Sequence, residues 1–191
     1  MRLGILGGSF DPPHIGHLLV AEDALAALHL DRLIFVPACA QPLKADRNAA
    51  PAEHRLAMVR AMVGDDSRFD VSPVEVERGG LSFTVDTLRH FSSQYPSAER
   101  FLLLGADVVT TFAQWREPEV VVRLAHPVIL QRAGSPASTQ DVAGVPLIRI
   151  ETRRVDISST EVRARVRQGL PIHGFVTDAV AALIARLGLY R

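Results

Sequence analysis

Two histidines three residues apart are the first side chains along the chain that suggest chemistry. They close the segment Gly7-Gly8-Ser9-Phe10-Asp11-Pro12-Pro13-His14-Ile15-Gly16-His17, which follows a short apolar run at 2–6. The two glycines let a backbone approach a ligand closely. A helix that begins near the histidines offers free N–H groups and a positive dipole, which favour a phosphate. Two imidazoles there can donate hydrogen bonds to phosphoryl oxygens as negative charge develops.

This segment matches neither of two common phosphate-binding motifs. It lacks the G-x-x-x-x-G-K-[ST] pattern of a P-loop and the G-x-G-x-x-G pattern of a dinucleotide-binding turn. Taken alone, the histidine pair also fits two exposed side chains or two metal ligands. The glycines also fit a tight connection from a strand to a helix, so these alternatives stay open.

A second candidate anion site lies near the end of the sequence, at Ile157-Ser158-Ser159-Thr160-Glu161-Val162-Arg163. Ser158 and Glu161 have the spacing of a capping box, which predicts a helix start. Free amides, two further hydroxyl groups and Arg163 one turn along would form an anion cradle. An ordinary capped helix with an exposed arginine is the alternative. Two helix starts of this kind in one chain favour a polyphosphate ligand.

Strands and helices that alternate would position these two segments. Apolar runs predict strands at 2–6, 33–36, 69–77, 101–104, 127–130 and 147–150. Helical spacing of apolar residues predicts helices at 15–29, from Pro51 to 63, and at 85–95, 117–124, 159–168 and 178–187. The remaining polar stretches, 38–50 and 133–146, read as loops. This order predicts an α/β fold with an open, Rossmann-like, mainly parallel sheet and helices on both faces, whose ligands lie at the carboxyl ends of the strands.

The composition restricts the classes of function. The chain has 191 residues, 21 basic and 21 acidic side chains and 48% hydrophobic residues, which is typical of a soluble globular protein. We expect one domain over 1–191, with a C-terminal helical portion from about 155. The zero net charge argues against a general nucleic-acid binder, and no apolar run is long enough for a membrane helix. The single cysteine, Cys39, excludes an internal disulfide and a multi-cysteine zinc site. We expect a cytoplasmic protein and leave open whether it forms a homo-oligomer.

The two motifs together resemble the nucleotidyltransferase superfamily that carries an H-x-G-H motif and a C-terminal ISST-x-x-R motif. The chain is more closely similar to the bacterial nicotinate-nucleotide adenylyltransferases, nearly from end to end. Beyond the two motifs, the residues that carry this similarity are Pro37, Pro42-Leu43-Lys44, Arg55-Leu56-Ala57-Met58, Ser82-Phe83-Thr84-Val85-Asp86-Thr87-Leu88, Leu104-Gly105-Ala106-Asp107, Trp115, Arg132 and Leu189-Tyr190. The segment from Ser82 to Leu88 narrows the resemblance to enzymes of pyridine mononucleotides. Phe83 stands where many members have Tyr, and Thr177 stands where Pro is common.

The resemblance implies an enzyme of NAD biosynthesis that joins ATP and nicotinate mononucleotide to give nicotinate adenine dinucleotide and pyrophosphate. It implies that His14, His17 and Arg163 are catalytic. It also implies a wider set of ATP-binding residues, which are Gly7, Gly8, Ser9, Phe10, Gly16, Gly105, Asp107, Ile157, Ser158, Ser159 and Thr160. Mg²⁺ would bridge the ATP phosphates without a dedicated protein cage.

The resemblance assigns the mononucleotide to four residues. Trp115 would stack on the pyridine ring, Thr84 and nearby amides would receive the nicotinate carboxylate, and Lys44 and Arg132 would bind the phosphate. From the residues alone, Trp115 also fits the core, Thr84 fits a helix cap, and Asp107, which the resemblance puts on the ribose hydroxyls, fits a helix N-cap. Three other functions remain: nicotinamide mononucleotide as acceptor, phosphopantetheine as acceptor, and a catalytically silent nucleotide sensor.

Overall fold

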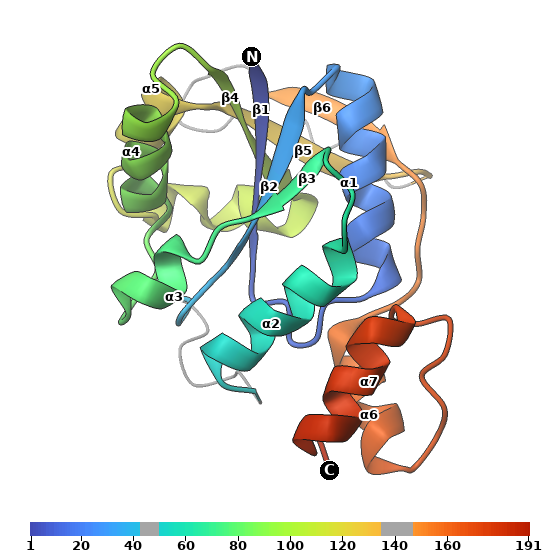
Figure 1. The fold of residues 1–191 in the computed structure, drawn as a ribbon. Helices are drawn as coiled ribbons and strands as arrows, with labels where there is room; N and C mark the ends of the chain where they lie inside the picture. The colour runs from blue at the N-terminus through green and yellow to red at the C-terminus, as the bar shows by residue number, and fades with distance from the viewer. Residues whose placement is uncertain (43–49, 135–146) are drawn as a thin grey trace.

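A parallel sheet forms the centre of the molecule (Figure 1). The structure is a computed structural model that describes residues 1–42, 50–134 and 147–191, without the side chains of Asp107 and Val109. Within these residues the strand order is β3-β2-β1-β4-β5-β6, and every neighbouring pair is parallel. The strands are β1 Arg2–Gly8, β2 Arg32–Pro37, β3 Phe69–Val71, β4 Glu99–Gly105, β5 His126–Arg132 and β6 Ile148–Thr152. The open parallel sheet expected from the sequence is confirmed.

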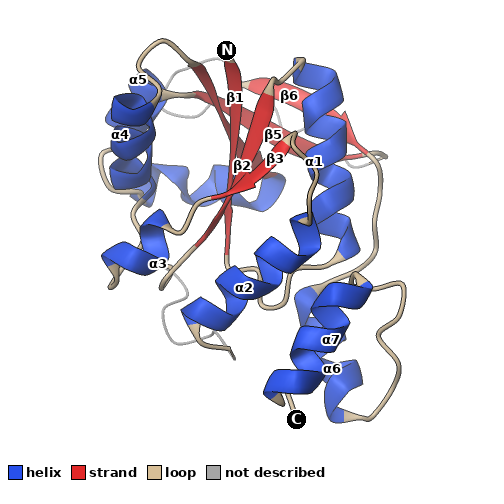
Figure 2. Cartoon of the chain, viewed as in Figure 1, coloured by secondary structure: helices blue, strands red, loops and turns tan. Residues whose placement is uncertain are grey.

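Helices cover both faces of the sheet, α1 and α2 on one side and α4 and α5 on the other (Figures 1 and 2). The helices are α1 Ile15–Leu28, α2 Ala52–Val63, α3 Val74–Arg78, α4 Thr84–Gln94, α5 Pro118–Leu124, α6 Ser159–Arg167 and α7 Asp178–Leu187, with the 3₁₀ helix η1 Ala106–Gln114 after β4. The last two helices lie beyond the sheet, and α7 packs against α2. Thr177 caps α7, because its hydroxyl accepts a hydrogen bond from the Val180 N–H at 3.4 Å.

Side chains alternate between two cores because successive residues of a strand point to opposite faces. In β2, Leu33 and Phe35 join the core under α1 and α2, whereas Ile34 and Val36 join the core under α4 and α5. The core under α1 and α2 also contains Val162, from α6. The apolar runs are therefore buried on both faces, as parallel strands usually are.

Two sequence-based assignments differ from the structure. The expected strand at 69–77 is wrong beyond Val71, because the chain turns at Pro73 and forms the short helix α3. The 3₁₀ helix η1, whose residues follow β4 directly, was not expected from the sequence. A 3₁₀ helix has three residues per turn, so it lacks the apolar spacing that reveals an α-helix.

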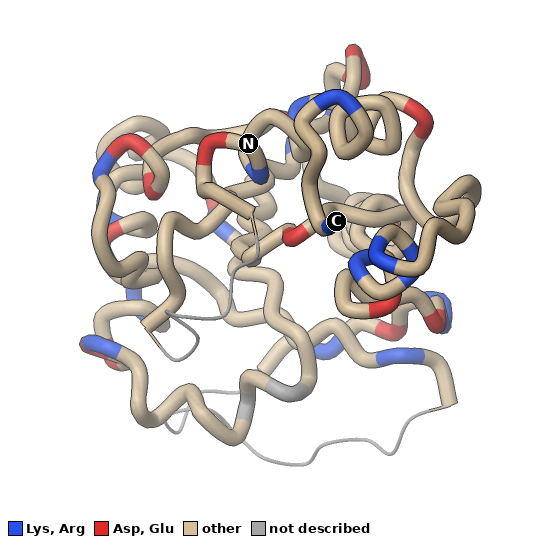
Figure 3. The backbone as a smooth tube through the Cα atoms, turned by 90° about the horizontal axis from the view of Figure 1, so that it is seen from below, with Lys and Arg blue, Asp and Glu red and all other residues tan. Residues whose placement is uncertain are grey.

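Charged residues of both signs are interspersed along the tube in Figure 3 rather than separated into faces. Many are paired with each other, for example Arg2 with Glu99 at 2.7 Å and Arg89 with Glu117 at 2.6 Å. Among the helices that the structure describes, none is long and apolar enough to cross a membrane.

Candidate active site

The histidine pair lies at the first turn of α1, as expected. His14 is the N-cap residue, and its backbone N–H donates to Nδ1 of His17 at 3.1 Å. The His17 N–H in turn donates to the His14 carbonyl at 2.9 Å. The two rings lie close together, with centroids 3.8 Å apart. These bonds fix both rings at the helix end where free amides and the helix dipole attract anions.

Both imidazoles are held in their neutral forms. Burial and, second to it, the positive charge of Arg132 lower the pKa of His14 to about 4. Burial and the neighbouring His14 also hold the pKa of His17 well below its usual range. Since Nδ1 of His17 accepts a hydrogen bond, the neutral ring carries its hydrogen on Nε2. His17 therefore presents one N–H donor at neutral pH.

Close packing explains the glycine between the two histidines. A Cβ on Gly16 would lie 2.9 Å from Nδ1 of His14, a separation that side chains do not tolerate. On the other side, the Phe10 ring packs edge-on against His17, with centroids 5.0 Å apart. Phe10 is buried and has a φ of 48°, a left-handed conformation that is unfavourable for a residue with a side chain. Packing by Gly16 and Phe10 therefore restricts the positions of the His14 and His17 rings.

The second motif meets the first although about 150 residues separate them. Ser158 caps α6, because its hydroxyl accepts from the Glu161 N–H at 3.1 Å. The Ser159 hydroxyl donates to the Pro12 carbonyl at 2.8 Å. The Arg163 guanidinium donates to the Asp11 carbonyl at 2.7 Å. The two helix starts inferred from the sequence therefore lie side by side, held by the loop between β1 and α1.

A cavity of about 660 Å³, here called the α1 cavity, opens between these two helix starts. Its lining contains seven of the residues expected to bind ATP or to act in catalysis, His14, Gly16, His17, Gly105, Ile157, Ser158 and Ser159. Thr160 and Arg163 lie outside this lining and are bonded to each other at 3.2 Å. Arg132 also lines the α1 cavity, although the sequence analysis grouped it with the mononucleotide.

A second cavity of about 460 Å³, here called the α4 cavity, lies on the other side of β1. Its lining includes Thr84, at the start of α4, and Trp115. Gly7 and Gly8, expected to bind ATP, line this cavity instead of the α1 cavity. The two cavities share Leu6 and Gly105, at the carboxyl ends of β1 and β4. This is the edge of a parallel sheet where ligands are expected.

Trp115 lines the α4 cavity and also packs against the edge of the core under α4 and α5. The side chain is partly buried, and its indole stacks on the buried Phe112 with centroids 5.0 Å apart. Arg116 lines the same cavity, lies 5.0 Å over the Phe83 ring and is 3.5 Å from Asp86. An aromatic wall beside a cation suits a planar ring that carries a negative group.

The α4 cavity also contains a buried carboxylate that the sequence analysis did not single out. Glu75 is 7% exposed, and its Oε1 accepts from the Thr87 hydroxyl at 2.6 Å. Burial raises the pKa of Glu75, although hydrogen bonds from Thr87 and Ser82 and the charge of Arg78 oppose that shift. Glu75 falls within the strand expected at 69–77, and nothing in the sequence indicated that this carboxylate would be buried in a cavity wall.

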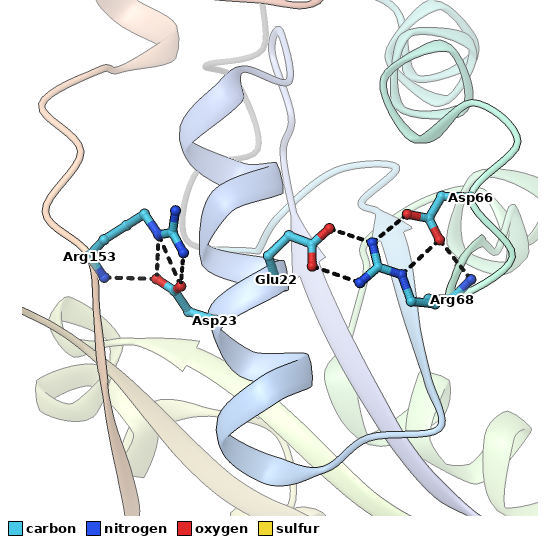
Figure 4. A network of polar contacts seen from close by, with 5 residues as sticks. All are labelled: Glu22, Asp23, Asp66, Arg68 and Arg153. Atoms are coloured by element: carbon cyan, nitrogen blue, oxygen red, sulfur yellow. Dashed lines mark hydrogen bonds and ion pairs between the residues drawn. The ribbon is translucent and has the colours of Figure 1, made fainter.

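Ion pairs fasten α1 to the segment that leads to α6 (Figure 4). Asp23, on α1, accepts from the backbone N–H of Arg153 at 2.8 Å and from its guanidinium at 2.6 Å. On the other side of the helix, Arg68 contacts both Glu22 and Asp66 at 2.6 Å. Because Arg153 also lines the α1 cavity, this network sets how the two helix starts face each other.

A buried arginine organises the loops around both cavities, and sequence reasoning missed its role. Arg55 is 1% exposed, and its guanidinium donates to four backbone carbonyls, those of Ser9, Ala38, Cys39 and Ala50. Its position in the sequence, among apolar residues on the inner face of α2, is the signal that could have shown it. Buried charges in proteins are usually paired or fully hydrogen-bonded.

Two expected site residues fall outside what the structure describes. Lys44 lies in the segment 43–49, and the side chain of Asp107 is also outside the described part. The backbone shows that Gly105, not Asp107, is the N-cap residue of η1. In the described residues, no group of three or more His, Cys, Asp and Glu side chains is arranged to hold a metal ion.

Comparisons with known proteins give a consistent result. The family model described as Cytidylyltransferase-like matches residues 5–165. A probable nicotinate-nucleotide adenylyltransferase from Gemmatimonas aurantiaca is 50% identical over 100% of this chain and 93% of its own length. One with the same description from Thermus thermophilus is 42% identical, with 100% of both chains covered.

Solved structures show the same fold. The nicotinic acid mononucleotide adenylyltransferase of Plasmodium falciparum, complexed with NaAD, matches with a TM-score of 0.78 and 20% identity. The match covers 99% of this chain and 97% of that one. At this identity the likeness concerns the fold alone.

Proposed function

We propose that this chain, which belongs to the cytidylyltransferase-like family, is an adenylyltransferase that joins ATP and nicotinate mononucleotide. The product is nicotinate adenine dinucleotide, a precursor of NAD, and pyrophosphate is released. One observation carries the proposal: two cavities meet at Leu6 and Gly105, at the carboxyl edge of the sheet. A nucleotide in each cavity would bring two phosphate groups together at this shared wall.

The reaction needs positioning rather than a protein nucleophile. An oxygen of the mononucleotide 5′-phosphate attacks the α-phosphorus of ATP and forms a new P–O bond. The bond from the α-phosphorus to the oxygen that bridges to the β-phosphate breaks, and pyrophosphate leaves with that electron pair. The main task of the protein is then to position the two substrates and to stabilise the negative charge on the phosphoryl oxygens in the transition state.

The histidine pair is suited to that task. His17 presents Nε2–H because its Nδ1 accepts from the His14 backbone. A neutral imidazole at the start of a helix donates to a phosphoryl oxygen without a large change in its own hydration, so the site is preorganised. Both rings line the α1 cavity, which we assign to ATP. The pair would stabilise the α-phosphoryl group during transfer.

The residues around α6 would hold the phosphates that leave. Ser158 and Ser159 line the α1 cavity, and the free amides of the α6 start favour anions. Arg163 stands one turn along, and Arg132 lines the same cavity near enough to His14 to lower its pKa. We therefore assign Arg132 to the phosphates where the two cavities meet. Mg²⁺ would accompany ATP, held mainly through phosphate oxygens, and would offset their negative charge.

The α4 cavity would receive the mononucleotide. Trp115 offers an aromatic face for the pyridine ring, beside the first-turn amides of α4 and the Thr84 hydroxyl. Together with the Arg116 guanidinium these groups are donors, which favour a carboxylate over a carboxamide. The nicotinate form is therefore the preferred acceptor.

A direct assay tests the proposal. The protein is incubated with Mg-ATP and, in separate reactions, with nicotinate mononucleotide, nicotinamide mononucleotide or 4′-phosphopantetheine, and pyrophosphate and the coupled product are measured. We expect the highest kcat/KM with nicotinate mononucleotide. A preference for the amide would correct the acceptor. Turnover with neither pyridine mononucleotide would overturn the proposal, and binding of ATP without turnover would instead support a silent sensor.

A further inference from the structure

The C-terminal tail reaches back to the active-site loop. Tyr190 is 7% exposed, and its hydroxyl donates to Oδ1 of Asp11 at 2.7 Å, across 179 positions of sequence. Its φ of 64° is left-handed, which is unfavourable for a residue other than glycine. Such conformations persist where surrounding contacts hold them. Tyr190 lies beyond residues 5–165, the part that the family model matches.

Asp11 connects this tail to Arg163. The Asp11 side chain is 3% exposed, and its Oδ1 also accepts from the Ala50 N–H at 3.2 Å. The backbone carbonyl of the same residue accepts from the Arg163 guanidinium at 2.7 Å. A shift of the Asp11 side chain would therefore move the Asp11 carbonyl, which accepts the hydrogen bond from Arg163.

The hydroxyl of Tyr190 is suited to a permanent donor role. Burial and the negative charge of Asp11 raise the pKa of Tyr190, so the hydroxyl keeps its proton. The nearby Arg55 guanidinium is bonded to carbonyls, including that of Ser9 at 2.7 Å, rather than to the Asp11 carboxylate. Tyr190 is thus one of the donors to a buried carboxylate, and its removal would take one hydrogen bond from that group.

We propose that Tyr190 is a positioning residue: it holds the Asp11 side chain and thereby fixes the loop between β1 and α1, whose carbonyls accept hydrogen bonds from Arg163 and Ser159 of α6. Ser159 rests on the same loop, through the Pro12 carbonyl at 2.8 Å. The inference rests on the proposed adenylyl transfer for its catalytic consequence. The contact itself does not depend on that function.

Tyr190→Phe tests the inference because it removes one oxygen and keeps the ring. We expect kcat to fall about tenfold, since small displacements of phosphate donors slow transfer strongly. The KM for the mononucleotide should change less than about twofold, because its cavity lies on the other side of β1. Tyr95→Phe is the matched control: this tyrosine packs on Phe91 in the other core, and its kinetics should equal those of the wild type.

A second variant and a second readout keep the test decisive. The Asp11→Ala variant and the double variant Asp11→Ala/Tyr190→Phe should have nearly the same kcat. Asp11→Ala already removes the hydrogen bond between Tyr190 and Asp11, so Tyr190→Phe has nothing further to remove from it. Hydrogen exchange of the backbone amides of Ser9, Phe10, Asp11 and His14 should be faster in Tyr190→Phe than in the wild type and unchanged in Tyr95→Phe. A Tyr190→Phe enzyme with wild-type kcat, or additive effects of the two substitutions, overturns the inference.

The two proposals fail in different ways. A wild-type protein that forms no dinucleotide refutes the proposed function, and the exchange rates of the same four amides then decide the positioning role alone. If Tyr190→Phe does not fold, Asp11→Asn weakens the acceptor of the same bond while it preserves size. Wild-type kcat and exchange rates in Asp11→Asn would then refute the role of the contact.

Discussion

Replacing His17 separates its role as a hydrogen-bond donor from its role in capping α1. In His17→Ala, the imidazole N–H of a residue that lines the α1 cavity is lost, and the His14 N–H loses its acceptor. Loss of one preorganised donor to a transition-state oxyanion typically lowers kcat by about 10² to 10³. This corresponds to about 2.7–4 kcal/mol in the activation free energy, since each tenfold change is about 1.36 kcal/mol.

The loss of the cap adds a separate effect on stability. A lost capping bond typically destabilises a protein by about 1 kcal/mol, which lowers the unfolding midpoint without changing kcat at lower temperature. His17→Asn isolates the donor, because its side-chain oxygen can accept from His14 as Nδ1 does, with no group at the position of Nε2. We expect His17→Asn to unfold near the wild-type midpoint and to retain the low kcat of His17→Ala.

The assay is steady-state pyrophosphate release, with thermal unfolding measured on the same samples. His90→Ala is the control, since His90 is exposed on α4 and away from both cavities. Wild-type kcat in His17→Asn would show that the cap, not the donor, sustains activity. Wild-type kcat in His17→Ala would refute the phosphate role of the pair altogether.

Four further outcomes follow from the two cavities. In Gly16→Ala, the new Cβ would lie 2.9 Å from Nδ1 of His14, so we expect kcat to fall at least tenfold, and unchanged kinetics would contradict the packing argument. In Gly7→Ala, the new methyl group meets no atom within 4 Å and projects beside the α4 cavity, so the KM for the mononucleotide should rise with no loss of stability in urea. Trp115→Ala should raise the same KM about tenfold with little change in kcat, whereas an unfolded variant would favour a core role. Burial raises the pKa of Glu75, so the folded state binds its proton more tightly than the unfolded state, and the wild type loses stability as pH rises from about 4. Glu75→Gln should remove that slope in urea titrations from pH 4 to 8, and parallel curves would refute the assignment.

The fold could be predicted largely because its parallel strands are buried on both faces. Runs such as Leu33–Val36 then become continuous apolar segments, which are readily found in a sequence. The expected strand at 69–77 was wrong because alternation of apolar residues there came from a short strand followed by one helical turn. The spacing of apolar residues over so short a segment does not distinguish a strand from a helical turn.

The candidate site could be predicted only where its geometry is local. His14, His17 and Ser158 are defined by spacing at a helix start, and the structure has them at the first turns of α1 and α6. The cavity that Arg132 lines depends on which strands are neighbours, so spacing could not assign it. The bond from Tyr190 to Asp11 joins the two ends of the chain, and no local pattern encodes it.

In the described residues, the linings of the two cavities have only Leu6 and Gly105 in common. The group that is transferred and the group that accepts it would therefore be recognised by separate sets of side chains, on α1 and α6 in one case and on α4 and η1 in the other. Mutations can remodel one set without disturbing the other. Recognition of the acceptor can therefore be altered by substitutions around α4 while the histidine pair is kept.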